Sequence, residues 1–271
     1  MGGRGEERLL CALRIRIVMD MMTAVLGRAR GAVVVGMLGF AAASWAYLWL
    51  VTTQMGDMSS VFAMPMTPAW SSGQTGLMIA MWVVMMAAMM LPSAVPMVAT
   101  YDRMDRRSVA GTGGSTALFV AGYIVMWSAF AVMATALQWV LHSAALVDGM
   151  GEATHGVLAG SLLIGTGIFQ FSPIKQRSLG ACRTPMGFLT TSWRNGAAGA
   201  FRMGVHHGSL CLRCCWALMI VLFALGVMNL IWVLLLTLFV AAEKMSRRGE
   251  AISTIGGVVM IVSGLAVVTG G

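Results

Sequence analysis

Charged side chains are scarce in this sequence of 271 residues. Asp, Glu, Lys and Arg together make up 10% of it, while hydrophobic residues make up 58% and mean hydropathy is +0.82. A soluble domain of this length cannot bury so much apolar surface, because a globule needs polar groups to cover its outside. The scarcity of charge therefore excludes a soluble globular protein. It predicts a polytopic helical membrane protein, with the lipid bilayer as its first partner.

The sequence also lacks the G-x-x-x-x-G-K-[ST] motif that binds nucleotide phosphates, so we do not expect direct ATP-driven pumping. Its net charge of +8 would indicate nucleic acid in a soluble protein. In a membrane protein, however, basic residues mark the cytoplasmic loops. We therefore predict no nucleic-acid partner and use the basic residues to orient the chain.

Apolar runs close to the roughly 20 residues that cross a bilayer occur about seven times along the chain. The fifth and sixth are separated only by "GVMN" (226–229), where we expect a tight turn between two helices. The predicted fold is an all-α polytopic transmembrane helical bundle. Its predicted spans are residues 32–54, 76–98, 115–141, 155–171, 208–226, 228–243 and 252–269.

Lys and Arg alternate between the segments that join these spans. They precede the first span and recur between spans two and three, four and five, and six and seven. The loops at 55–75 and 142–154 contain neither residue. Because basic residues accumulate in cytoplasmic loops, we predict a cytoplasmic N-terminus, a C-terminus outside, and multi-pass insertion in a bacterial cytoplasmic (inner) membrane.

The chain divides into a basic cytoplasmic leader, residues 1–31, and a single transmembrane helical domain, residues 32–271. The leader alternates basic and apolar residues, a pattern that also suits a helix lying on the membrane surface. A cleaved signal peptide is the competing interpretation, since "AAASWA" resembles a small-residue cleavage site. The full spanning length of the apolar stretch favours an uncleaved anchor.

Cysteine is also rare, with five in the chain. Cys11, Cys182, Cys211, Cys214 and Cys215 all fall at or near the predicted cytoplasmic side, where thiols stay reduced. A structural disulfide is therefore not expected.

Three of the cysteines belong to a column of soft donors. If the fifth span is helical from about residue 203, its donors recur every four residues and share one face. This column comprises Met203, His207, Cys211, Cys215 and Met219, with Cys214 joining it and with Cys182 and His206 close to it in the adjoining loop. Thiolate, imidazole and thioether donors select Cu(I) and also suit Zn(II) or an iron–sulfur cluster. The alternative is that the cysteines are merely small residues packed between helices.

The second span is rich in methionine. Met85, Met89 and Met90 are the thioether partners that we predict for the cysteines, because both segments lie near the cytoplasmic end. Methionine is also a flexible core filler, so packing alone is the competing explanation. Pro92 and Pro96 predict a break in this helix, because each removes a backbone donor and clashes with the carbonyl four residues earlier.

Three segments resemble a bacterial family of unknown function whose members are labelled predicted metal-binding integral membrane proteins. The segments are "AMWVVMMAAMMLPSAVPM" (80–97), "FQFSPIKQRSLGACRTP" (169–185) and "GVHHGSLCLRCCWALMIVLFALGVMNLIWVLLLTLFVAAEK" (204–244). The family pattern C-L-x-x-C-R-x-P places Cys182 at its second cysteine and Ser178 at its first. The resemblance implies a metal site that uses the later cysteines.

Glu243 and Lys244 also match the family as they stand. Two interpretations are open for this pair: the opposite charges neutralise each other at the membrane surface, or Glu243 is a hard metal ligand or a proton carrier beside the cysteines.

The leading hypothesis is an integral membrane protein that binds a soft transition metal, copper rather than zinc, near the cytoplasmic face for passage, delivery or sensing. The alternatives are a metal- or thiol-dependent membrane oxidoreductase, with catalytic residues unknown, and a structural membrane subunit without metal. Further membrane or periplasmic proteins are candidate partners. The candidate ligands are Cys211, Cys214, Cys215, His207, His206, Cys182, Met85, Met89, Met90 and Glu243.

Overall fold

The computed structural model describes residues 32–54, 70–106, 115–148 and 151–270. The predicted leader at 1–31, with Cys11, lies outside the described residues. Within them the fold is helical, as predicted, and the elements are α2 (Ala32–Gln54), α3 (Ser72–Asp105), α4 (Ser115–Ser143), α5 (Gly156–Gln170), α6 (Pro173–Arg183), α7 (Pro185–Ser192), α8 (Gly196–Ile220), α9 (Leu222–Leu225), α10 (Leu230–Met245) and α11 (Gly249–Gly270).

Five single helices in the described part are long and apolar enough to cross a membrane: α2, α3, α4, α8 continued through α9, and α11. A sixth candidate is the pair α5 and α6, which bends by 64° at its break. Helix α10 coincides with the predicted sixth span, but it has 16 residues, or a length of about 24 Å. The bundle is therefore confirmed as helical, and the count of seven spans stays a prediction.

The predicted turn at 226–229 is confirmed. Gly226 has φ +88°, a left-handed conformation that glycine adopts without strain. The Asn229 side chain then accepts a hydrogen bond from Ile231 N and begins α10. This turn lets α10 fold back beside α3 instead of continuing α8 and α9.

The predicted break at Pro92 and Pro96 is wrong, because α3 is one helix from Ser72 to Asp105. Neighbouring side chains hydrogen-bond to the carbonyl oxygen of Met90 just before the prolines. Ser93 Oγ donates to it at 2.9 Å and Tyr123 Oη, from α4, donates at 3.3 Å. These two contacts join α3 to its own turn and to α4 at Met90. The carbonyls that Pro92 and Pro96 leave without a helical donor are those of Ala88 and Pro92, and α3 continues through both prolines.

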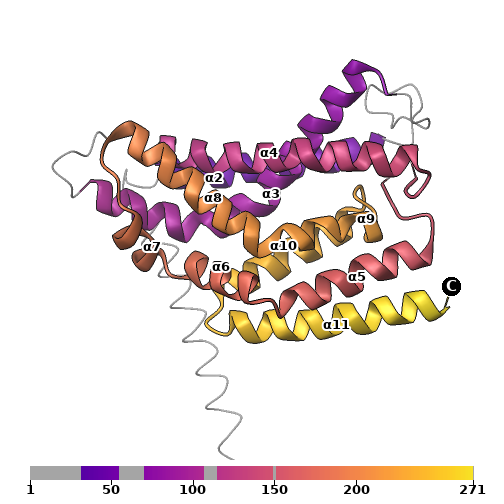
Figure 1. Ribbon diagram of the computed structural model, residues 1–271. Helices are drawn as coiled ribbons and strands as arrows, with labels where there is room; N and C mark the ends of the chain where they lie inside the picture. Colours follow the sequence, from indigo (N-terminus) through magenta and orange to yellow (C-terminus); the bar gives the residue numbers. More distant parts are fainter. Residues whose placement is uncertain (1–31, 55–69, 107–114, 149–150, 271) are drawn as a thin grey trace, which may run out of the picture.

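Helices α4 and α8 lie side by side, as do α5 and α11, with α3 and α10 between these pairs (Figure 1). The first pair is in close contact because Gly122 of α4 faces the backbone of Phe201, and Gly204 of α8 faces that of Phe119. Buried residues make up 61% of the apolar stretches of α3 and α8, against 17% in α11. The donor-rich α3 and α8 are therefore the central helices.

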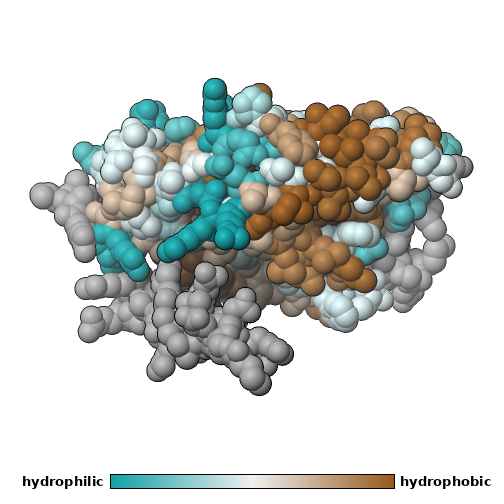
Figure 2. Space-filling model, turned by 90° about the horizontal axis from the view of Figure 1, so that it is seen from below, coloured by the Kyte–Doolittle hydropathy of each residue, from teal (hydrophilic) through white to brown (hydrophobic). Residues whose placement is uncertain are grey.

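Two of the segments that carry basic residues meet at one end of the described helices. Arg183 at the end of α6 donates to the carbonyls of Ser246 and Arg247 between α10 and α11, each at 2.7 Å. At the other end, Trp70 Nε1 donates to His142 Nδ1 at 3.3 Å. Figure 2 shows hydrophilic residues over the side where Figure 1 has α6 and α7, and apolar surface over the side of α5 and α11.

Candidate metal centre

Three cysteines of α8 lie together in the interior of the bundle. Cys211, Cys214 and Cys215 are each no more than 2% exposed. The thiols of Cys214 and Cys215 donate to the carbonyl oxygen of Cys211 at 3.0 and 2.8 Å. Hydrogen bonds of this kind, to a carbonyl three or four residues earlier, hold a side chain against its own helix. The predicted helical face of thiols is thus present.

A fourth thiol comes from α6. Cys182 interacts with the thiols of Cys211 and Cys214, and Cys211 also interacts with Cys215. All four of these cysteines are free, and Cys182 is the one that is partly exposed. Cys211 is therefore the centre of the cluster, and Cys182 is its contact with the surface.

Helix α3 adds a thioether. Met90 Sδ lies 4.0 Å from Cys215 Sγ, and the Met90 side chain is fully buried. Met85 and Met89 are buried in the same core at 1% exposure. Of the three predicted methionines, Met90 is thus the one whose sulfur meets a thiol among the described residues.

Lys244 of α10 extends into this cluster. Its Nζ lies 2.9 Å from Cys211 Sγ, 3.2 Å from Ser93 Oγ and 3.7 Å from Met90 Sδ, and the residue is 8% exposed. Tyr123 Oη lies 3.1 Å from the same Cys211 sulfur. The sulfur and oxygen donors therefore surround a position that already accommodates one positive charge.

The two histidines occupy different environments. His207, one turn before Cys211, is 3% exposed, and its ring packs against the rings of Tyr123 and Phe188 with centroids 5.5 Å away in each case. Its Nδ1 has no hydrogen-bond partner within the described residues. His206 is exposed and its ring lies 5.3 Å from that of Phe188. Only His207 lies in the interior beside the thiols.

Glu243 and Lys244 do not neutralise each other by direct pairing. The Lys175 Nζ of α6 donates to both carboxylate oxygens of Glu243 at 2.9 Å, and both residues are buried. Burying a charge is costly unless it is paired and hydrogen-bonded, and this bidentate contact meets that condition. The structure therefore turns Glu243 toward Lys175 and Lys244 toward the thiols.

The described residues contain no group of three or more His, Cys, Asp or Glu side chains arranged to hold a metal ion. A structural zinc centre needs about four such ligands in a tetrahedron. Thiolates beside a thioether are instead the soft donors that select Cu(I). The thiols and the thioether near Cys211 are soft donors of this kind.

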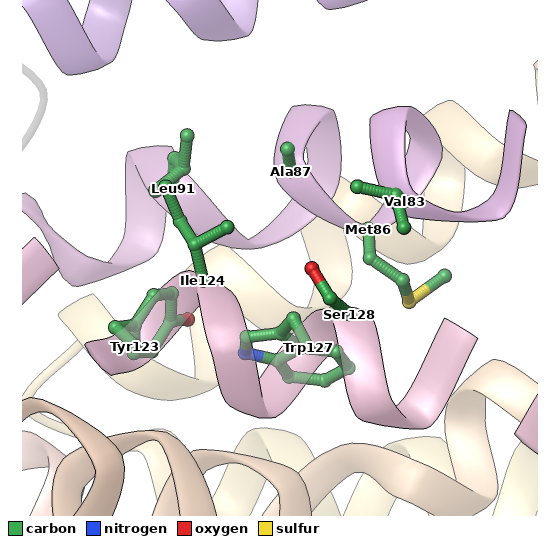
Figure 3. A pocket seen from close by; sticks show the side chains of 8 residues that line it. All are labelled: Val83, Met86, Ala87, Leu91, Tyr123, Ile124, Trp127 and Ser128. Carbon is green, nitrogen blue, oxygen red and sulfur yellow. The ribbon is translucent and has the colours of Figure 1, made fainter. Parts of the chain in front are cut away.

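A narrow pocket lies next to the cluster, between α3 and α4 (Figure 3). Tyr123 is common to both, because its ring lines the pocket while its hydroxyl meets Cys211. The pocket is lined by Val83, Met86, Ala87, Leu91, Tyr123, Ile124, Trp127 and Ser128. With this mostly apolar lining and without cysteine or histidine, it is not the metal centre.

Comparison with known families decides the class of the protein. A family described as PpoB2, copper chaperone, matches residues 79–267, which include every member of the thiol cluster. The chain belongs to the copper chaperone family PpoB2. This agrees with the resemblance to predicted metal-binding membrane proteins and supports copper handling. Comparison with curated proteins and with solved structures gives no match.

Three residues of this copper chaperone family member were not candidates from the sequence. Lys244 looked like a surface anchor, and Tyr123 and Ser93 carried no motif. The available signal was their polarity within apolar segments, since polar and ionisable groups there are costly and usually functional.

Proposed function

We propose that this protein is a membrane-embedded copper chaperone that holds Cu(I) in the thiol cluster, near the cytoplasmic ends of the helices. Cys211 is the central ligand, with a second thiolate from Cys182, Cys214 or Cys215 and a thioether from Met90. Copper is the cargo of the protein, so the site must both bind the ion and release it.

The observation that carries this proposal is the meeting of thiols from two helices at Cys211. Three other cysteine thiols interact with it or with each other, and the Met90 sulfur contacts Cys215. Helical spacing alone brings Cys214 and Cys215 close to Cys211, whereas Cys182 comes from a different helix, and its approach to the same sulfur supports a shared site. Soft donors gathered in this way select Cu(I), and the family assignment points to the same ion.

The proposed position in the membrane depends on the charge pattern. The α6 end and the α10–α11 turn, which are joined through Arg183, carry the basic residues that mark cytoplasmic loops. Cys182 lies one residue before Arg183. The cluster is therefore proposed to exchange copper with the cytoplasmic side.

The experiment that tests this function is Cu(I) binding by the purified full chain in detergent. Wild type is titrated with Cu(I) against a coloured chelator under reducing, anaerobic conditions. We expect one Cu(I) per chain, and we expect a Cys211→Ser, Cys215→Ser double variant to lose it. The expected loss is about 100-fold or more in affinity, at least the loss that changing an outer-shell partner causes.

Cys11 provides the matched control, because it lies outside the residues matched by the family. The Cys11→Ser variant should keep the full Cu(I) stoichiometry. Equal and negligible copper in wild type and in the double variant would contradict the proposal and leave helix packing as the role of the cysteines.

A further inference from the structure

Lys244 is a buried cation that the proposed binding chemistry does not explain by itself. A lysine ammonium at 2.9 Å from Cys211 Sγ repels any metal cation that approaches the same sulfur. A neutral residue such as methionine would fill this space and supply another soft donor. A charge in this position therefore requires a reason.

The reason lies in the total charge of the loaded site. Metal ligands of this kind bind as thiolates, so Cu(I) held by two thiolates carries one net negative charge. A buried net charge is costly unless an opposite charge is close to it. Lys244 supplies one positive charge and makes the loaded site neutral.

The same count gives a different result for a divalent ion. Zn(II) held by two thiolates is already neutral, so Lys244 beside it leaves one uncompensated positive charge. The other nearby buried charges do not alter this balance, because Lys175 and Glu243 form a neutral ion pair through both carboxylate oxygens. Lys244 is the charge that contacts a thiol.

We infer that Lys244 makes the site specific for a monovalent metal ion, by balancing the charge of a bis-thiolate Cu(I) complex and opposing a divalent one. This inference rests on the proposed function, since it concerns the same thiols. Ser93 Oγ, 3.2 Å from the ammonium, is a second partner that holds Lys244 beside the thiols. Selectivity thus comes from a charge beside the ligands, not from the number of donors alone.

The test compares Cu(I) and Zn(II) affinities of the purified full chain for wild type, Lys244→Met and Lys244→Arg. Each metal is titrated alone against a chelator of known affinity. We expect Lys244→Met to bind Cu(I) about 10- to 100-fold more weakly, the usual effect of losing an outer-shell partner, and to bind Zn(II) more tightly. Lys244→Arg keeps the charge and should keep the wild-type ratio of the two affinities.

Opposite changes for the two metals distinguish charge balance from a packing role, which would weaken both metals together. An unchanged ratio in Lys244→Met, with wild type binding Cu(I), overturns this inference and leaves the proposed function standing. Wild type without Cu(I) binding contradicts the proposed function and this inference together. If Lys244→Met does not fold, Lys244→Gln provides the same neutral test, because its amide can still donate to Cys211.

Discussion

Cys182 differs from the other cysteines of the cluster in its exposure. It is partly exposed on α6, whereas Cys211, Cys214 and Cys215 are buried. A metal that enters or leaves a buried thiol cluster needs a ligand that an outside acceptor can reach, and thiols exchange partners according to their access. Cys182 is therefore the residue at which we expect copper to be handed over.

Replacing Cys182 with serine should separate holding copper from exchanging it. The Cys182→Ser variant retains Cys211 with its α8 neighbours, so we expect Cu(I) to remain bound. We expect its transfer to an excess of chelator to be about tenfold slower, which corresponds to about 1.4 kcal/mol in the barrier. Stopped-flow absorbance of the chelator complex measures the rate.

The control for this variant is Ser178→Ala, at a buried position one turn earlier on the same helix. It alters the packing of α6 without removing a thiol and should transfer copper at the wild-type rate. A Cys182→Ser variant that releases copper as fast as wild type would show that the exchange does not pass through Cys182.

The column of thiols on α8 could be predicted at the residue scale, because helical periodicity alone puts Cys211 and Cys215 on one face. The partners of Glu243 and Lys244 could not be predicted in this way. Adjacent residues on a helix point in directions about 100° apart, so these two charges meet different neighbours, and only the packing of α6, α3 and α8 around α10 decides which.

At the scale of elements, the site depends on how closely α4 and α8 approach. Gly204 of α8 faces the backbone of Phe119 on α4, and one turn along α4 the Tyr123 hydroxyl reaches Cys211. Small residues let membrane helices come this close. The helix contact thus sets the position of Tyr123 next to the central thiol.

A methyl group at Gly204 should separate these helices. In Gly204→Ala the added Cβ would overlap the carbonyl oxygen of Phe119, which cannot move without its helix. Overpacking of this kind costs about 1–3 kcal/mol, so we expect a lower midpoint of thermal unfolding in detergent and weaker Cu(I) binding. Fluorescence-detected thermal unfolding and the Cu(I) titration measure the two effects.

Gly165 on α5 is the matched control, because a Cβ built there meets no atom within 4 Å. Gly165→Ala should retain the stability and copper affinity of wild type, and its better helix propensity favours a slight gain in stability. If both alanine variants unfold alike, close contact between α4 and α8 is not what holds the site.

Elements of uniform apolar character were predictable from the sequence, and α2, α4 and α11 lie close to their predicted ranges. The continuity of α3 could not be predicted, because a proline in the sequence either ends a helix or is accommodated within it, and α3 runs through both Pro92 and Pro96. The start of α8 at Gly196 was also missed, since residues 196–207 are too polar to extend an apolar run.

At the scale of the whole molecule, the topology is defined by how many times the chain crosses the membrane. The basic segments predict seven crossings and opposite sides for the two termini. Five single helices meet the length and hydropathy of a span, and α5 with α6 adds a bent sixth. Whether the number of crossings is six or seven therefore depends on α10. At about 24 Å, this helix is shorter than the roughly 30 Å apolar layer of the bilayer.

We expect α10 to cross all the same. It runs from the turn at Gly226, near Glu152 of a loop without basic residues, to Lys244 beside the basic α6 end, so its two ends lie at opposite ends of the bundle. A span shorter than the apolar layer is accommodated by local thinning of the bilayer at modest cost. Seven crossings then place the C-terminus outside.

Reporter fusions in a bacterial host measure this directly. Alkaline phosphatase, which is active only outside the cytoplasm, should be active when fused after Gly271 and inactive when fused after Arg248. A fluorescent protein that matures in the cytoplasm should give the reverse pattern at the same two sites. Active phosphatase at both sites, or at neither, would mean that α11 does not cross between them. Activity only after Arg248 would mean that the basic residues do not orient the chain, and copper would then be exchanged on the opposite side from the one proposed.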